Sequence, residues 1–272
     1  YLSVPLSNWA DIKGSGKFAT NEMESNDIQF MCINYESSEV LNNDKVRQAI
    51  VHATNREAMN VVATDGLGKV TDFYIHPHAE AAPTECDVDL SYNPELAKSL
   101  LAEAGYPDGV DVGEILVGTG SSEPYATVLQ SNLAEVGITA KITTLEFGVA
   151  VDRMASQDYN ICIVGDNGNY DFNNFEQQSS SSAIGLTNVL FNGPSGKFND
   201  LSAKFDEWLK EGSSTADEAK RVEIYTEMYN AYYDTHTQVP LLNLPSCVAY
   251  SKDLNAVAVP TDYRVYDWSW NS

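Results

Sequence analysis

Residues 113–165 alternate between two kinds of apolar pattern: GEILVGTGSSEPYATVLQSNLAEVGITAKITTLEFGVAVDRMASQDYNICIVG. Strand patterns lie at 115–117, 138–143 and 159–164, and helical patterns lie between them at 125–136 and 147–155. Gly137 closes the first helical pattern. An order of strand, helix, strand, helix, strand predicts parallel strands joined by right-handed crossovers, and therefore an α/β fold.

Upstream of this core, the sequence predicts a strand at Ile28–Asn34 and two helices. Asn42-Asn43-Asp44 is a capping cluster before a long helical pattern that reaches Val62. Asn93 caps the second helix, which Gly105 ends. Residues 69–92 lie between the two helices, are rich in Pro, His and Asp, and predict an irregular excursion.

Downstream, GDNGNYDFNNF at 165–175 follows the last strand of the alternating core. Ligands of open α/β sheets bind outside the carboxyl ends of strands, so this stretch is the candidate site. A helix is predicted around 201–209, and another from a capping box at Thr215–Glu218 to Tyr232. Late strands are expected at 239–244 and 247–250.

The composition excludes some classes of partner. The chain has 272 residues, with 16 Lys plus Arg against 39 Asp plus Glu, and a formal net charge of −23. Nucleic acids and anionic membrane surfaces attract basic proteins, so neither is expected as a partner. The plain interpretation is a self-repelling, solvated surface. No stretch approaches the length of a membrane span.

The cysteines and histidines indicate neither a disulfide scaffold nor a metal site. The four cysteines, Cys32, Cys86, Cys162 and Cys247, form no C-x-x-C pair and are interpreted as buried free thiols. His76 and His78 lack a third ligand, and a solvated loop is the better interpretation. No nucleophile motif is present, so we expect neither a cofactor, a metal nor an enzymatic activity, although sequence does not exclude a Ser-His-Asp hydrolase.

Three motifs resemble the family 5 extracellular solute-binding proteins, which include dipeptide and oligopeptide receptors of ABC transporters. They are NNDKVRQAIVHATNRE (42–57), the family signature YNPELAKSLLAEAGYPDG (92–109), and LQSNLAEVGITAKI (129–142) with the later GDNG and DFNNF. Phe172 stands where many members have proline, and the loop is two residues longer. The resemblance covers the second half of a typical member.

The resemblance implies a fold and a domain organisation. We expect an α/β lobe like that of type II periplasmic-binding proteins, with a mixed sheet flanked by helices. Residues 1–34 would lead out of a missing first lobe, 35–250 would form the second, ligand-binding lobe, and 251–272 would return toward the first. The start of the chain resembles no signal peptide, so we expect it to be part of a longer secreted or lipid-anchored protein.

The resemblance also implies a function and a set of site residues. A monomeric receptor would bind a peptide between two lobes and deliver it to permease subunits of an ABC transporter. Alternative solutes are a metal chelate, an opine or an oligosaccharide. Asp166 matches the acid that takes the ligand's ammonium group in peptide receptors, and a turn-capping Asp is the alternative. The predicted site is Gly165, Asp166, Asn167, Gly168, Tyr170, Asp171 and Glu123.

Two of these residues carry specific expectations. Asp171 is the fallback if Asp166 only caps its own turn. Glu123 precedes Pro124-Tyr125, at the place where dipeptide receptors of the family have the arginine that binds the ligand's carboxylate. The reversed charge predicts a receptor that is not restricted to dipeptides. An acid also suits the first turn of a helix, which is the alternative reason for Glu123. Arg47 and Arg56 are interpreted as surface or interlobe salt bridges.

Overall fold

A mixed sheet runs through the computed structural model, which describes residues 1–73, 81–83, 85–120, 122–167, 193–257 and 264–271. The strands, in spatial order, are β1 (Leu2–Ser3), β7 (Gln238–Tyr250), β2 (Ala19–Ile33), β6 (Ile161–Asn167), β4 (Val110–Gly118) and β5 (Ile138–Leu145), and β3 (Lys69–Val70) pairs with β7. β4 is parallel to β5 and β6, whereas β2 is antiparallel to both β6 and β7. The α/β fold with a mixed sheet is therefore confirmed.

The predicted alternating core is confirmed element by element. β4 leads into α6 (Glu123–Glu135), β5 follows, and α7 (Phe147–Ala155) leads into β6. Because all three strands are parallel neighbours in one sheet, their carboxyl ends meet at the same edge. The candidate site residues Glu123 and Asp166 follow or end two of these strands.

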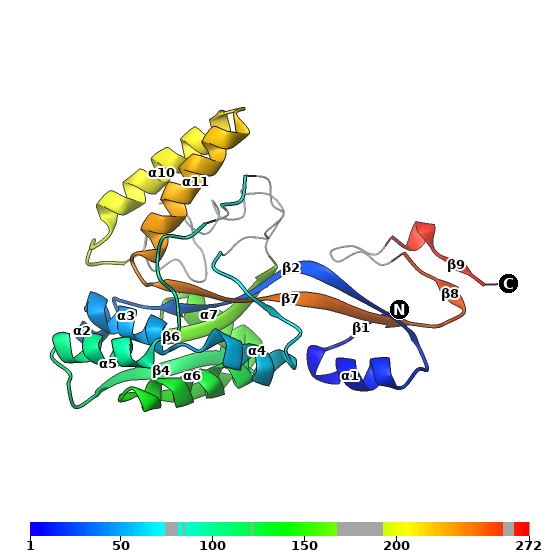
Figure 1. Ribbon diagram of the computed structural model, residues 1–272, viewed down its shortest axis with the longest axis horizontal. Coiled ribbons are helices and arrows are strands. Elements are labelled where there is room, and N and C mark those ends of the chain that lie inside the picture. The colour runs from blue at the N-terminus through cyan, green and yellow to red at the C-terminus, as the bar shows by residue number, and fades with distance from the viewer. Residues whose placement is uncertain (74–80, 84, 121, 168–192, 258–263, 272) are drawn as a thin grey trace.

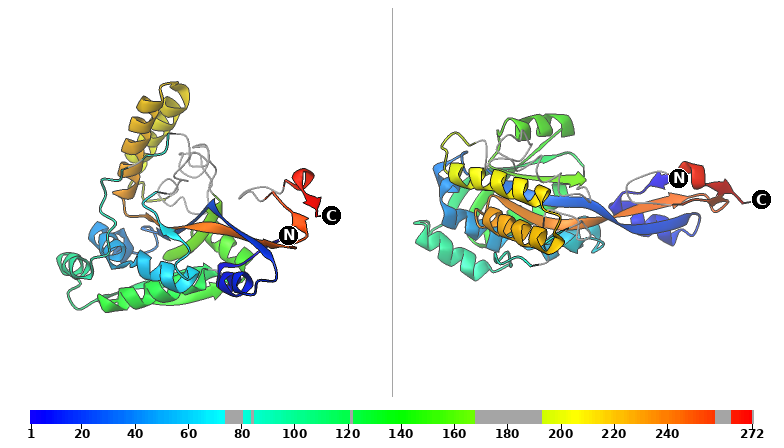
Figure 2. Two further views of the ribbon diagram at one scale, coloured as in Figure 1. Left: turned by 45° about the vertical axis from the view of Figure 1, so that its right-hand side comes forward. Right: turned by 90° about the horizontal axis from the view of Figure 1, so that it is seen from above.

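Helices cover both faces of the sheet (Figures 1 and 2). One face carries α3 (Asp44–Ala53), α4 (Arg56–Thr64), α5 (Pro94–Glu103) and α6, whose apolar side chains share a core with Met31 and Ile163. The other face carries α7, α10 (Asn199–Ser214) and α11 (Glu218–Tyr233), which pack on Ile28 and Val164. The short α2 (Glu39–Asn42) precedes α3.

Two helix boundaries differ from the prediction. The long helix predicted from Asp44 to Val62 is two helices, α3 and α4, because Asn55 caps a new helix by accepting a hydrogen bond from Ala58 N at 2.9 Å. The capping box predicted at Thr215 is also wrong. Asp217 is the cap of α11 and accepts from Lys220 N at 3.2 Å. The Asn93 cap of α5 is confirmed by its bond from Leu96 N.

β2 is longer than the predicted strand at 28–34, because residues 19–27 also pair with β7. The sheet of the lobe therefore takes in residues before the boundary drawn at residue 35. The outer parts of β2 and β7, with β1, α1 (Leu6–Gly14), β8 (Leu254–Asn255), the 3₁₀ turn η1 (Val265–Asp267) and β9 (Ser269–Trp270), form an arm that extends from the helical layers (Figure 1).

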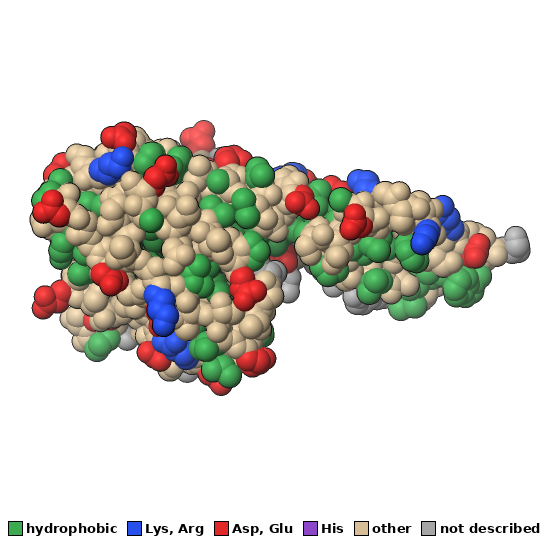
Figure 3. All heavy atoms as spheres, turned by 90° about the horizontal axis from the view of Figure 1, so that it is seen from below, with side chains coloured by type: hydrophobic (Ala, Val, Ile, Leu, Met, Phe, Trp, Pro, Cys, Tyr) green, Lys and Arg blue, Asp and Glu red, His purple; other side chains and the backbone are tan. Residues whose placement is uncertain are grey.

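The arm has a small core and an apolar outer surface. Val4, Trp9, Cys247 and Ala249 form its core. Its exposed hydrophobic side chains include Leu2 (62% exposed), Tyr266 (76%) and Trp270 (72%), and Figure 3 shows hydrophobic side chains along the arm. Figure 3 also shows one face of the helical part, where the acidic side chains are scattered and form no single patch. Such a distribution is expected of a solvated acidic surface.

Candidate ligand-binding site

The candidate site is built at the carboxyl end of β6. Gly165, Asp166 and Asn167 were predicted to lie in a loop, but they are the last three residues of the strand. The strand continues because β2 supplies a partner for each of them: Gln29 opposite Gly165, Ile28 opposite Asp166 and Asp27 opposite Asn167. Asp166 is half-buried, and the backbone at Gly165 is exposed.

Along its last residues, β6 has a neighbouring strand on only one side within the described part of the chain, namely β2. β4 pairs with β6 only at Ile115–Ile161 and Leu116–Cys162. Beyond these pairs β4 continues alongside β5 as far as Gly118, so the β4 side of residues 163–167 lacks a described strand partner. An extended chain can hydrogen-bond to such an edge.

The two faces of the strand end differ in chemistry. Side chains alternate along a strand, and Ile28 and Val164 pack under α11, so Asp166 belongs to that face. Asp27, Gln29 and Gly165 belong to the face covered by α6, where Met31 and Ile163 enter the other core. Polar residues therefore stand on both faces at the end of the β2–β6 pair.

Asp27 and Gln29 were not predicted as site residues. Burial raises the pKa of the Asp27 carboxyl, a hydrogen bond with the Gln29 side chain opposes this, and the charge of Asp166 adds to the increase. Gln29 is 5% exposed, and its Oε1 lacks a hydrogen-bond partner among the described residues. The sequence shows only that these polar residues alternate with the apolar Ile28 and Phe30, which does not by itself indicate a site.

Gly165 is required by packing against Gln29. A Cβ at residue 165 would lie 1.9 Å from Gln29 Nε2. The structure thus places the Gln29 amide against one side of this predicted site residue. Burial raises the pKa of the hydroxyl of Tyr125 in α6, and the negative charge of Asp27 contributes.

Glu123 is the first residue of α6 and is exposed. Ser122, at the N-cap position, makes no side-chain capping hydrogen bond. Glu123 is the acidic residue of the first turn, where a negative charge interacts favourably with the helix dipole. The alternative reason for this residue, a favourable interaction with the helix dipole, therefore fits its position. Because β4 and β6 are parallel neighbours, Glu123 and Asp166 lie toward the same edge of the sheet.

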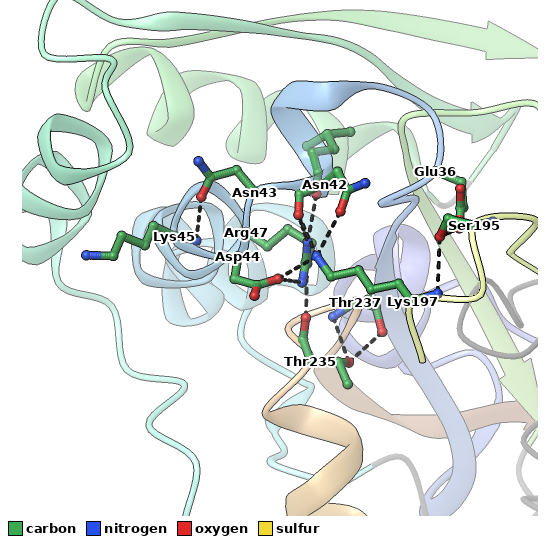
Figure 4. A network of polar contacts seen from close by, with 11 residues as sticks. Glu36, Asn42, Asn43, Asp44, Lys45, Arg47, Ser195, Lys197, Thr235 and Thr237 are labelled. Atoms are coloured by element: carbon green, nitrogen blue, oxygen red, sulfur yellow. Dashed lines mark hydrogen bonds and ion pairs between the residues drawn. The ribbon is translucent and has the colours of Figure 1, made fainter. Parts of the chain in front are cut away.

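Arg47, in the motif at 42–57, has a structural role, and its interpretation as a surface salt bridge is wrong. Arg47 is 1% exposed. Its guanidinium donates to the carbonyls of Thr235 at 3.0 Å, Leu41 at 2.8 Å and Asn42 at 3.1 Å, and it pairs with Asp44. Figure 4 shows this group at the centre of a polar network that joins α2, α3 and the start of β7.

The same network fastens the chain that follows the candidate site. Lys197 donates to the carbonyl and side-chain oxygens of Asn42 at 2.6 and 2.8 Å and pairs with Asp44 at 2.9 Å. Ser195 N donates to Glu36 Oε1 at 3.1 Å (Figure 4). Residues 195–197 are therefore fixed to the α2–α3 region.

Arg56 is also inside the structure rather than on a helix surface. It donates to Thr71 O at 2.8 Å and Leu90 O at 3.0 Å, and it pairs with Asp72 at 2.9 Å. These bonds attach the irregular excursion to α4. Both arginines therefore hydrogen-bond within the lobe rather than forming surface salt bridges alone.

The predicted site residues Gly168, Tyr170 and Asp171 lie outside the described part of the chain, as do Phe172 and the histidines His76 and His78. In the described ranges, no group of three or more His, Cys, Asp or Glu side chains is placed to hold a metal ion. Among the helices of these ranges, none has the length and apolar character needed to cross a membrane.

Known binding proteins are similar to this chain in sequence. The chain is 28% identical over 252 residues to the dipeptide-binding protein of Escherichia coli, covering 88% of this chain and 44% of that protein. It is 26% identical over 254 residues to heme-binding protein A of Haemophilus influenzae, covering 90% and 44%. The chain thus spans about half the length of the curated relatives it matches.

The fold is that of a solved receptor. The oligopeptide-binding protein AppA from Bacillus subtilis, in complex with a nonapeptide, superposes with a TM-score of 0.82 at 21% identity, covering 99% of this chain and 56% of that one. The family model described as bacterial extracellular solute-binding proteins, family 5 middle, matches residues 1–184. On this match, the chain belongs to the family 5 bacterial extracellular solute-binding proteins.

Proposed function

We propose that this chain is the second lobe of a receptor that binds a peptide or peptide-like solute. One observation carries the proposal: the end of β6 combines a half-buried carboxylate, Asp166, with a strand edge along which β4 pairs no further than Cys162. An extended peptide can pair its main chain with that edge, which gives affinity without side-chain selectivity. Its ammonium group can hydrogen-bond to Asp166.

The rest of the receptor would lie beside the arm. Residues 1–34 and 251–272 are proposed to connect the ligand-binding lobe, residues 35–250, with a first lobe that the relatives' greater length could supply. The exposed apolar side chains of the arm, such as Tyr266 and Trp270, support this arrangement because they are large and unburied. Closure of two lobes around a ligand would then be a hinge motion.

The cellular role follows from the same proposal. The receptor would work outside the cytoplasmic membrane, either free in the periplasm or attached as a lipoprotein. It would act as a monomer and deliver its ligand to the permease subunits of an ABC transporter. It would perform no chemistry on the ligand.

A different solute is the second candidate. A relative that matches the chain to a similar degree is named as a heme-binding protein, so membership of the family does not decide the ligand. Asp27 and Glu123 add acids near the Asp166 end of the sheet. They favour a ligand that brings a cationic or neutral group to this edge.

Native mass spectrometry of the whole receptor, purified from its host, tests the proposal. We expect masses that exceed the protein by those of noncovalently bound peptides, which denaturation releases intact. A bound metal chelate, opine or oligosaccharide would favour the second candidate. Incubation with a peptide library, followed by product analysis, gives the control, because cleaved peptides would indicate a hydrolase and overturn the binding role.

A further inference from the structure

Two of the four cysteines are opposite each other in the sheet. Cys32 of β2 and Cys162 of β6 are direct partners in the antiparallel register. Both are free thiols with 0% exposure, and both belong to the core beneath α11. Residues far apart in the sequence thus bring two sulfur atoms to the same face of adjacent strands.

The backbone hydrogen bonds fix the spacing of this pair. Asn34 N donates to Asn160 O at 2.8 Å, and these residues are two positions beyond Cys32 and Cys162 in the same register. Antiparallel pairs alternate, so Cys32 and Cys162 also form a hydrogen-bonded pair, whose Cα atoms lie about 5.5 Å apart. Disulfides join Cα atoms separated by about 4.4–6.8 Å, so this separation lies within their range. The Cβ atoms of such a pair, about 5.5 Å apart, must approach to about 3.5–4.5 Å when the bond forms, which requires a small local shift of the two strands.

The surroundings of the two thiols also favour a bond between Cys32 and Cys162. Burial raises the pKa of Cys162, and contact with the Cys32 thiol contributes next. Tyr159 and Tyr232 pack in the same core and cover the pair. An oxidant can reach the sulfur atoms only before this core closes, so the bond would form during folding. The other two cysteines differ: Cys86 is only partly buried, and Cys247 lies opposite Glu22.

We propose that Cys32 and Cys162 form a disulfide bond when the chain folds in an oxidising environment. Each thiol loses its proton, and one Sγ–Sγ bond forms. The two electrons reduce the disulfide of a thiol–disulfide oxidant, such as oxidised glutathione, to two thiols. The bond would covalently join β2 to β6 next to the candidate site. Its formation in the cell depends on the extracytoplasmic location proposed above, whereas its formation in vitro does not.

Refolding in a glutathione redox buffer tests the proposal. The whole receptor is unfolded and reduced, refolded, alkylated under denaturing conditions and digested for mass spectrometry. We expect a linked peptide pair containing Cys32 and Cys162, with Cys86 and Cys247 alkylated. Alkylation of Cys32 and Cys162 to the same extent as the other two would overturn the proposal.

Matched cysteine variants test whether the linkage between Cys32 and Cys162 is specific. The Cys86→Ala and Cys247→Ala double variant should keep the linked pair, whereas Cys32→Ala should lose it and leave Cys162 alkylated, without a new disulfide to Cys86 or Cys247. Since only peptide masses are read, a variant of reduced stability still gives a result. Loss of the linked pair in the Cys86→Ala and Cys247→Ala variant would contradict the assignment.

A further measurement distinguishes the proposed disulfide from the proposed extracytoplasmic location. The receptor is purified from its host, with free thiols alkylated at lysis, and its cysteine peptides are analysed in the same way. A linked pair in vitro with free thiols in the host would place folding in a reducing compartment and contradict the proposed location, while supporting the bond itself. Free thiols after refolding in vitro would overturn the bond and leave the location untouched.

Discussion

Burial raises the pKa of Asp27, and the negative charge of Asp166, which stands on the opposite face of the β2–β6 pair, adds to the increase. A raised pKa means that the native state holds a proton that the unfolded state has released. Stability therefore falls as the pH rises from the ordinary Asp value of 3.8 through the raised value.

Asp27→Asn should consequently stabilise the protein at neutral pH, because it removes a poorly solvated charge and keeps a hydrogen-bonding amide. The gain should shrink toward zero as the pH falls below 3.8, where Asp27 is protonated in both states. Thermal unfolding across this pH range measures it, with the exposed Glu57→Gln as control. A neutral-pH melting temperature below that of the native protein would contradict the prediction.

Asp166→Asn should weaken the binding of peptides with a free amino terminus. Loss of one charge-assisted hydrogen bond costs about 1.5–3 kcal/mol, which is roughly tenfold or more in affinity. Titration calorimetry of the whole receptor measures the change. Amino-terminally acetylated peptides, which carry no ammonium group, should show little difference between the two proteins, and equal losses for both kinds of peptide would argue against the assigned role.

Gly165→Ala should destabilise the lobe, because the new Cβ would stand 1.9 Å from Gln29 Nε2 and displace a buried side chain. Overpacking of this kind costs about 1–3 kcal/mol. In a Gln29→Ala background the same change should cost much less, since the obstructing amide is gone. Unfolding free energies of the four proteins form a double-mutant cycle, and a penalty of equal size in both backgrounds would place the strain elsewhere.

Arg47→Met should be strongly destabilising. It removes the donor from the carbonyls of Thr235 and Leu41, while the Asn42 carbonyl keeps its hydrogen bond from Lys197. Unsatisfied buried acceptors cost about 1–3 kcal/mol each, so a total of roughly 2 kcal/mol or more is expected. Lys45→Met is the control on the same helix. It removes the exposed pair with Glu103, which is worth about 1 kcal/mol or less. Similar denaturation midpoints for the two variants would show the network to be unimportant.

The charge of Glu123 should exclude strict dipeptide binding. A dipeptide held at Asp166 would bring its carboxylate toward this acid, which replaces the arginine of dipeptide receptors. We expect tetrapeptides and pentapeptides to bind better than free dipeptides, and Glu123→Gln to reduce that preference. A binding screen of the whole receptor across peptide lengths measures it. A preference for dipeptides that Glu123→Gln leaves unchanged would defeat the prediction.

The alternating core could be predicted because its signals are local. Apolar periodicity and Gly137 define α6, β5 and their order, and parallel pairing follows from the connections. The break between α3 and α4 was missed because both helices have the same periodicity and only the Asn55 cap separates them. In such a case a capping residue inside a helical pattern can be decisive.

The site was predicted only in part, because its composition depends on pairing across the sheet. Asp166 could be located from the strand that precedes it. Asp27 and Gln29 could not, since their position beside Gly165 requires the register of β2 on β6, which joins residues more than a hundred positions apart. Arg47 looked like a surface charge, and its burial depends on carbonyls as distant as that of Thr235.

The place of β2 between β6 and β7 also has a consequence for biosynthesis. β2 leaves the ribosome well before its partner β7, because all the helices and strands from α2 to α11 lie between them in the sequence. Until residues 238–250 arrive, this long strand, whose second half is apolar, keeps one row of backbone groups unpaired, which is the kind of surface that recruits other unfinished chains. A nascent chain stalled or cut before Gln238 would therefore be an aggregation hazard, and it would profit from a chaperone that keeps β2 apart until translation ends.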